Sequence, residues 1–254
     1  MSLGQVLDDL SKYVELQMDE GTSSAKVSED VMGGLKGAVE GQGSQEPVTE
    51  AAPKTSDSPG SGADLERIAL EISECKLCQL HSSRTKTVPG QGSPSPEIMF
   101  VGEGPGADED KAGLAFVGRA GQLLTRMIEA MGYTREEVFI GNIVKCRPPE
   151  NRAPEPAEMI ACMPYLKRQI AALQPRVIVA LGATAVKGLV EMPKGMGITK
   201  LRGTWMSFEG IDLMPTFHPA YLLRNANMKK YVWEDLKTVL HHLGRPIPEV
   251  KKRG

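Results

Sequence analysis

The chain has 254 residues, of which 41% are hydrophobic, so it can bury the core of one sizeable domain and still carry further segments. No apolar run in the sequence approaches the roughly 18 residues of a membrane span, and the N-terminus lacks a basic region followed by an apolar one, as in a secretory signal. We therefore expect a cytoplasmic protein without a membrane partner. The net charge of -2 is uneven: residues 1–63 carry 4 Lys and Arg against 11 Asp and Glu, and the remainder carries 26 against 21. The mildly basic remainder is compatible with nucleic-acid contact.

The N-terminal quarter of the chain differs in composition from the rest. The segment LGQVLDDLSKYVELQM (3–18) places apolar residues at helical spacing, so residues 1–20 are predicted to contain an amphipathic helix. Such a helix either frays in isolation or docks on a protein partner. Residues 21–63 are rich in Gly, Ser, Pro, Thr and acidic side chains, which predicts a disordered linker. A globular domain is expected at 64–246, followed by a basic tail at 247–254.

Within the globular part, apolar runs typical of strands alternate with stretches of helical period. In chain order we expect a helix at 65–72, a strand at 97–103, a helix at 119–131, a strand at 138–144, a helix at 156–173, a strand at 176–182, a helix at 183–191, a strand at 211–217 and a helix at 231–243. This alternation predicts an α/β fold with a mainly parallel sheet covered on both faces.

Chemically distinctive residues fall at the carboxyl ends of these strands. Glu103 and Gly104 follow the first strand, Asn142 lies in the second, and His218 follows the fourth. Sites in parallel sheets lie beyond the carboxyl ends of the strands, so we expect these residues to converge. A buried amide is costly unless it is paired. Asn142 is therefore either a structural amide bonded to the backbone or a group that recognises a ligand.

The four cysteines form two pairs far apart in the sequence. Cys75 and Cys78 make a C-x-x-C turn, which suits one metal centre, and Cys146 and Cys162 would complete a shell of four thiolates. Structural disulfides are not expected in a reducing cytosol. We predict one structural metal site rather than four ordinary buried cysteines. Zinc and an iron–sulfur cluster both accept four thiolates, so the spacing alone does not separate them.

Three segments, interleaved with the cysteines, resemble one known family. They are GEGPGADEDKAGLAFVGRAGQLL (102–124), NIVKCRPPENRAP (142–154) and HPAYLLR (218–224). Together they resemble the iron–sulfur uracil-DNA glycosylases, family 4 of that superfamily, from about Cys75 to Leu243. The resemblance implies a three-layer α/β/α sandwich and a [4Fe-4S] cluster on the four cysteines, with zinc the alternative. It implies an enzyme of base excision repair that flips uracil out of DNA, hydrolyses the N-glycosidic bond and leaves an abasic site.

The resemblance also implies roles for the residues at the strand ends. The loop of Gly102, Glu103 and Gly104 would line the uracil pocket and place the attacking water. Phe116, which as a lone aromatic also fits a core position, would stack on the flipped base. Asn142 would pair with uracil O4 and N3–H, and His218 would donate a hydrogen bond to O2, where negative charge develops.

The chain departs from family 1 of the superfamily at two positions of the first segment. Gly104 stands where family 1 has the Asp that activates water, so Glu103 becomes the candidate carboxylate. Gly106 stands where family 1 has the Tyr that excludes the thymine methyl group, so Glu109 becomes a candidate for that specificity role.

Candidate DNA-binding residues follow the second strand and His218. Apolar wedges and an Arg suit insertion into the gap that a flipped nucleotide leaves, although each Leu equally suits packing at a helix start. Two basic residues also flank Cys146. The expected DNA contacts are Leu222, Leu223, Arg224, Lys145 and Arg147.

Three other classes of protein account for part of these features. A uracil-DNA binding protein without turnover would carry a basic, His-containing loop after the second segment, but Asn142 runs directly into KCRPPENRAPEP. A zinc-stabilised nucleic-acid binding module leaves the strand-end Asn142, His218 and the Gly-rich loop unexplained. A phosphate-binding nucleotide enzyme would need the Lys of a P-loop. The motifs place no Lys as a Schiff-base nucleophile, so we expect a monofunctional, monomeric enzyme that does not cleave the strand.

Overall fold

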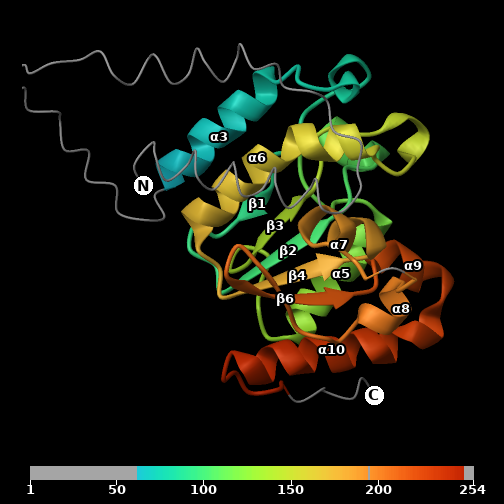
Figure 1. Cartoon of the computed structure of the whole chain (residues 1–254). Coiled ribbons are helices and arrows are strands. Elements are labelled where there is room, and N and C mark those ends of the chain that lie inside the picture. The colour runs from blue at the N-terminus through green and yellow to red at the C-terminus, as the bar shows by residue number, and fades with distance from the viewer. Residues whose placement is uncertain (1–61, 194, 249–254) are drawn as a thin grey trace, which may run out of the picture. The chain divides into compact units, whose positions relative to one another are not determined.

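The computed structural model describes residues 62–193 and 195–248. Within these residues a six-stranded sheet has the order β1-β3-β2-β4-β6-β5 (Figure 1). The four central strands are parallel: β2 (Ile98–Gly102), β3 (Phe139–Asn142), β4 (Val177–Leu181) and β6 (Ile211–Thr216). Two short edge strands run antiparallel to their neighbours: β1 (Gln91–Gly92) and β5 (Met206–Phe208). The predicted α/β fold with a mainly parallel sheet is confirmed.

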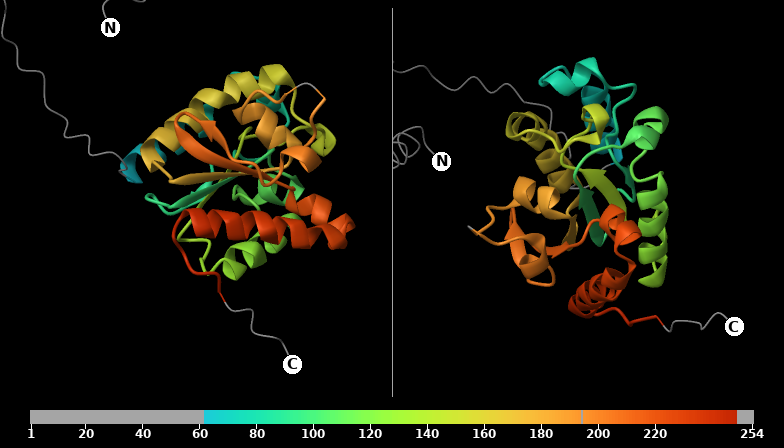
Figure 2. Two further views of the ribbon diagram at one scale, coloured as in Figure 1. Left: turned by 60° about the horizontal axis from the view of Figure 1, so that its bottom comes forward. Right: turned by 90° about the vertical axis from the view of Figure 1, so that its right-hand side faces the viewer.

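Helices cover both faces of this sheet (Figures 1 and 2). The described helices are α3 (Gly62–Glu74), α4 (Ala107–Ala112), α5 (Arg119–Ala130), α6 (Pro156–Leu173), α7 (Ala183–Leu189), α8 (Ile198–Leu201), α9 (Pro219–Arg224) and α10 (Lys229–His242). Short 3-10 turns lie at η1 (Gln79–Ser82), η2 (Pro149–Asn151) and η3 (Ala226–Met228). Apolar side chains of α5, α9 and α10 pack in one core, those of α6, α7 and α8 pack in the other, and α3 lies against α6.

Burial on both faces explains why the two innermost strands, β2 and β4, are continuous apolar runs. Side chains alternate along a strand, so Ile98 and Phe100 of β2 enter the core with α5 and α10, whereas Met99 and Val101 enter the core with α6. A parallel sheet sandwiched in this way needs apolar residues at every position. The four strands predicted from the sequence correspond to the four central strands.

The expected elements and the observed ones differ mainly in short segments. The five predicted helices correspond to α3, α5, α6, α7 and α10. The edge strands and the helices α4, α8 and α9 are too short to show a period, and the sequence did not predict them. The predictions for residues 1–20 and for most of 21–63 and 247–254 lie outside the described residues, and the boundaries at 64 and 246 stay predictions. No described helix is long and apolar enough to span a membrane.

Candidate active site

The parallel pairing of β2 and β3 brings the Gly-rich loop beside Asn142. Gly102 lies opposite Asn142 in the register, and both strands end at these residues. A Cβ atom on Gly102 would lie 2.5 Å from Asn142 Oδ1 and 2.5 Å from Phe116 Cζ. Only a hydrogen atom fits at Gly102. Because Gly102 has no side chain, the Asn142 amide and the Phe116 ring can both pack against its backbone. The register therefore brings the start of the Gly-rich loop beside Asn142, as expected for the carboxyl ends of neighbouring parallel strands.

The side-chain amide of Asn142 is buried with an unused acceptor. Asn142 is 1% exposed. Among the residues that the structure describes, its Oδ1 is the one buried side-chain nitrogen or oxygen without a hydrogen-bond partner. A buried acceptor without a donor costs free energy, on the order of 1–3 kcal/mol. A structural role would pair this oxygen with the backbone, so its state fits a group reserved for a ligand that carries an N–H.

Phe116 is held in an uncommon backbone conformation next to this amide. Its φ angle is +54°, a region that non-glycine residues rarely adopt. Its ring is buried and lies 5.7 Å from the His218 ring between centroids, with an angle of 34° between the planes. The conformation depends on Gly121 of α5, where a Cβ would lie 1.9 Å from the Phe116 carbonyl oxygen. Phe116 therefore belongs both to the core and to the wall of the site.

The carboxylate of Glu109 joins the Gly-rich loop to the segment that carries Phe116. Its Oε2 accepts a hydrogen bond from Gly106 N at 3.1 Å. Its Oε1 accepts from Val117 N and Gly118 N, both at 2.9 Å. Both oxygens thus bind backbone amides, which gives Glu109 a positioning function that the sequence did not reveal. Its predicted role in rejecting thymine stays a prediction.

His218 caps α9 with its ring in a defined hydrogen-bonding state. Its Nδ1 accepts a hydrogen bond from Ala220 N at 3.1 Å. A neutral ring with Nδ1 as acceptor carries its proton on Nε2, which is then a donor. Burial lowers the pKa of His218 to about 4; the carboxylate of Glu109 opposes this shift, and the charge of Arg224 adds to it. His218 therefore offers a neutral N–H near neutral pH.

The remaining loop residues, Glu103 and Gly104, follow β2 directly. The Glu103 carbonyl accepts a hydrogen bond from Val144 N at 3.2 Å, and its side chain is partly exposed. No hydrogen bond or ion pair of its carboxylate occurs within the described ranges. A Cβ on Gly104 would lie 2.7 Å from Val144 Cγ2. An Asp at position 104, as in family 1, would therefore need Val144 to move.

The five residues predicted to contact DNA differ in their exposure to solvent. Leu223 is 38% exposed and Arg224 is exposed on α9, whereas Leu222 is 1% exposed and packs in the core with α5 and α10. The predicted DNA contact of Leu222 is wrong, because its side chain is buried in the core and cannot reach DNA. Arg147 is partly exposed and donates through Nε to Asn151 Oδ1 at 2.8 Å. Its DNA contact stays a prediction.

Lys145 is likewise unavailable to DNA. It is 1% exposed, and its Nζ donates to the Asn142 carbonyl oxygen at 2.9 Å and to Gln169 Oε1 at 2.7 Å. The predicted surface contact is therefore wrong. Burial lowers the pKa of Lys145 to about 8, although the Cys162 thiolate opposes this shift.

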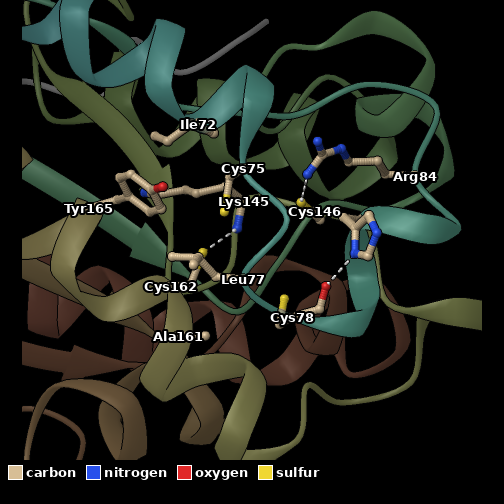
Figure 3. A pocket seen from close by; sticks show the side chains of 11 residues that line it. Ile72, Cys75, Leu77, Cys78, Arg84, Lys145, Cys146, Ala161, Cys162 and Tyr165 are labelled. Atoms are coloured by element: carbon tan, nitrogen blue, oxygen red, sulfur yellow. Dashed lines mark hydrogen bonds between the residues drawn. The ribbon is translucent and has the colours of Figure 1, made fainter.

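The four cysteines line one cavity between α3, the end of β3 and α6 (Figure 3). Cys75 and Cys78 are partly exposed, and Cys146 and Cys162 are buried. Two N–H groups donate to the buried pair: Arg84 Nη1 to Cys146 Sγ at 3.2 Å and the Lys145 backbone N to Cys162 Sγ at 3.3 Å. Hydrogen bonds to sulfur and nearby cations are what thiolates around a metal cluster require.

These cysteines surround a space rather than meeting at one point. No group of three or more His, Cys, Asp or Glu in the described part of the chain has the geometry to hold a single metal ion. The predicted four-cysteine constellation is nevertheless brought together around one cavity. A set of four thiolates is one that either an iron–sulfur cluster or zinc can use.

Several residues that shape the site were missed by the sequence analysis. Gly182, at the end of β4, has a φ of +91°, and a Cβ there would lie 3.0 Å from His218 Cβ. Its position at a strand end was the available signal. Arg84 and Gln169 had no signal, because each acts on residues more than 20 positions away.

Comparison with known proteins agrees with this architecture. The family model described as the uracil DNA glycosylase superfamily matches residues 89–237, which places the chain among the uracil-DNA glycosylases. A type-4 uracil-DNA glycosylase of Sulfurisphaera tokodaii is 50% identical over 182 residues, or 69% of this chain and 83% of the relative. The type-4 enzyme of Thermotoga maritima is 48% identical over 178 residues, or 68% and 91%. That of Archaeoglobus fulgidus is 39% identical over 190 residues, or 72% and 96%. Within the superfamily, the chain belongs to the type-4 family.

Proposed function

We propose that this protein removes uracil from DNA by hydrolysing the N-glycosidic bond and leaves an abasic site for base excision repair. One observation carries the proposal: the buried, unpaired Oδ1 of Asn142 lies next to the Phe116 ring, which in turn lies 5.7 Å from the His218 ring. A planar base with a ring N–H would satisfy the amide oxygen while stacking on the aromatic ring.

The amide of Asn142 distinguishes uracil from cytosine. Its Oδ1 accepts from uracil N3–H, and its Nδ2 donates to uracil O4. Cytosine presents an acceptor at N3 and a donor at N4, so the same amide would face two unpaired polar groups. Site groups left unpaired in this way reject an analogue far more strongly than a missing methylene does.

His218 supports departure of the base. When the bond to the sugar breaks, negative charge develops on the uracil ring and its O2. The Nε2–H of neutral His218 is the donor that would stabilise this charge, and it is already oriented by the bond that Nδ1 accepts from Ala220 N. No reorientation of the ring is required during the reaction.

The Gly-rich loop would hold the attacking water. Gly102 and Gly104 keep side chains out of the region beside Asn142 and Val144. Glu103 is the acidic residue of this loop, and no described group engages its carboxylate. We assign it the orientation of the water. Leu223 and Arg224, exposed on α9, and the partly exposed Arg147 would contact the DNA around the flipped nucleotide.

The four cysteines fit a [4Fe-4S] cluster, which would have a structural role in this enzyme. Cys75 and Cys78 follow α3, Cys146 follows β3, and Cys162 lies in α6, so a cluster would join these three segments. Hydrolysis of a glycosidic bond transfers no electrons, and no step requires the cluster to change its oxidation state.

The direct test is uracil release from an oligonucleotide, with Asn142→Asp as the matched variant. We expect wild-type protein to release uracil and to leave alkali-labile sites without direct nicks, and Asn142→Asp to lose release while it keeps its fold. Tight binding without release would favour a uracil-capture protein. Neither binding nor release would favour a metal-stabilised nucleic-acid binding module, and nicks with a trapped covalent adduct would contradict the monofunctional mechanism.

A further inference from the structure

Lys145 lies between Asn142, the last residue of β3, and the cavity lined by the four cysteines. Its Nζ donates to the Asn142 carbonyl oxygen at 2.9 Å and to Gln169 Oε1 at 2.7 Å, and Gln169 Nε2 donates to Pro89 O at 2.8 Å. The backbone N of the same residue donates to Cys162 Sγ at 3.3 Å (Figure 3). One residue thus connects Asn142, the helix α6 and a cysteine of the candidate cluster.

The ammonium group of Lys145 supplies a hydrogen bond to β3 that a neighbouring strand would otherwise supply. The edge strand β1 pairs with β3 only at Phe139 and Ile140. Beyond these residues, the peptide unit after Asn142 donates through Ile143 N to Gly102 O at 2.9 Å on the β2 side. Its carbonyl faces the other side, beyond the first residue of the antiparallel strand β1. A buried carbonyl needs a donor, and Lys145 Nζ supplies it, which fixes this peptide unit from both sides.

Within the described residues, the Lys145 ammonium group donates no hydrogen bond to a carboxylate. Both acceptors of Nζ are neutral oxygens, and the side chain is fully buried. A buried charge is costly unless opposite charge lies nearby. The opposite charge here would come from the cysteine thiolates, beside which Lys145 and Arg84 both lie. A cationic bridge at this place therefore suits a cluster of net negative charge.

We propose that Lys145 is a positioning residue for uracil recognition, which holds the main chain of Asn142 against α6 so that the cysteine cluster supports the orientation of the Asn142 amide. This inference rests on the proposed function. Asn142 would bind uracil both before and during bond cleavage, so loss of its orientation removes binding more than it slows the chemical step.

The test is Lys145→Met in the cluster-loaded full chain. We expect the visible absorbance of the cluster to persist, KM for uracil-DNA to rise about tenfold or more, as loss of a charge-assisted hydrogen bond predicts, and kcat to change by less. The matched control is Lys167→Met, which removes an exposed Lys of α6 whose surface ion pair with Glu209 contributes little. This control should keep both constants.

A spectroscopic readout separates positioning from general loss of stability. The chain contains four asparagines, Asn142, Asn151, Asn225 and Asn227. Selective 15N-asparagine labelling therefore yields few side-chain amide signals, and Asn142→Asp identifies that of Asn142. We expect Lys145→Met to shift the Asn142 signal and to leave the other three in place.

An unchanged KM together with an unchanged Asn142 signal would overturn the proposal, as would a loss confined to kcat. If Lys145→Met does not fold, Gln169→Met decides: it keeps the ammonium but removes its second acceptor, and an unchanged KM would also reject the proposal. Failure of the proposed function itself is distinguishable, because wild-type protein would then release no uracil.

Discussion

The rings of Phe116 and His218 lie 5.7 Å apart although they follow strands that are not neighbours. Phe116 follows β2, His218 follows β6, and β4 lies between these strands in the sheet. The chain leaves β4 through Gly182, where a Cβ would lie 3.0 Å from His218 Cβ. The absence of a side chain at Gly182 leaves room for His218, whose ring then reaches that of Phe116 across the end of β4.

The protonation state of His218 predicts the pH dependence of the reaction. Its pKa falls from the ordinary 6.5 to about 4 through burial, so the ring stays neutral and keeps its Nε2–H down to about pH 4. We expect single-turnover uracil release, measured between about pH 5 and 8, to show no loss centred at 6.5. A sharp loss there would show that the imidazole titrates freely.

The same shift predicts a stability effect of definite sign. Between about pH 4 and 6.5 the unfolded chain binds a proton at His218 that the folded protein does not bind. The free energy of unfolding is therefore reduced progressively as pH falls through this window, and the contribution is constant above 6.5. Denaturant titrations should show a weaker pH dependence in His218→Asn than in the wild type. Equal dependence in both would contradict the shift.

Gly102→Ala should damage the site without disrupting the sheet. The added methyl group would meet Asn142 Oδ1 and Phe116 Cζ at 2.5 Å, so both groups must move. Overpacking of this kind costs about 1–3 kcal/mol of stability, and displacement of two base-binding groups should lower kcat/KM by roughly two orders of magnitude. Gly197→Ala is the control, because a Cβ at Gly197 would meet no atom within 4 Å. Equal activity of the two variants would show that the approach at Gly102 is not required.

Glu109→Ala should lose activity on uracil, because the Glu109 carboxylate joins two loop segments of the site. Removal of the carboxylate leaves the backbone N–H groups of Gly106, Val117 and Gly118 without their acceptor. These residues are partly exposed, so each lost hydrogen bond costs about 0.5–1.5 kcal/mol; the melting temperature should fall and uracil release should slow. Glu129→Ala, at an exposed position of α5, is the control. Full activity on uracil with new release of thymine would instead support the specificity role for Glu109.

The parts of the fold that the sequence predicted are those with local signals. The run RVIVALG identifies β4 because a strand buried on both faces needs apolar residues at every position, and the strand-end rule then locates Asn142 and His218. The edge strand β1 has two residues and no such pattern. It forms because Gly92, with a φ of +132°, allows close contact with the backbone of Val138.

Residues whose environment is set by distant segments are the ones that local sequence does not place. Lys145 and Arg147 flank Cys146 in the second segment, and Lys145 was predicted to face DNA. Its burial depends on Gln169 of α6 and on the loop at Pro89, neither of which is local. Glu109 also bonds to the amides of a loop eight and nine residues downstream, a positioning function that no local pattern indicates.

The two leucines of α9 should separate stability from DNA contact. Leu222 is 1% exposed and packs in the core, so Leu222→Ala should destabilise the protein by about 2–5 kcal/mol through lost contacts and a residual cavity. Leu223 is 38% exposed, so Leu223→Ala should change the free energy of unfolding by less than about 1 kcal/mol. If Leu223 fills the gap left by a flipped nucleotide, its loss should lower release from duplex DNA more than from single-stranded DNA, since only the duplex has a stack to hold open. Denaturant titration and single-turnover release on both substrates measure these effects. Equal losses on the two substrates would remove Leu223 from the flipping step.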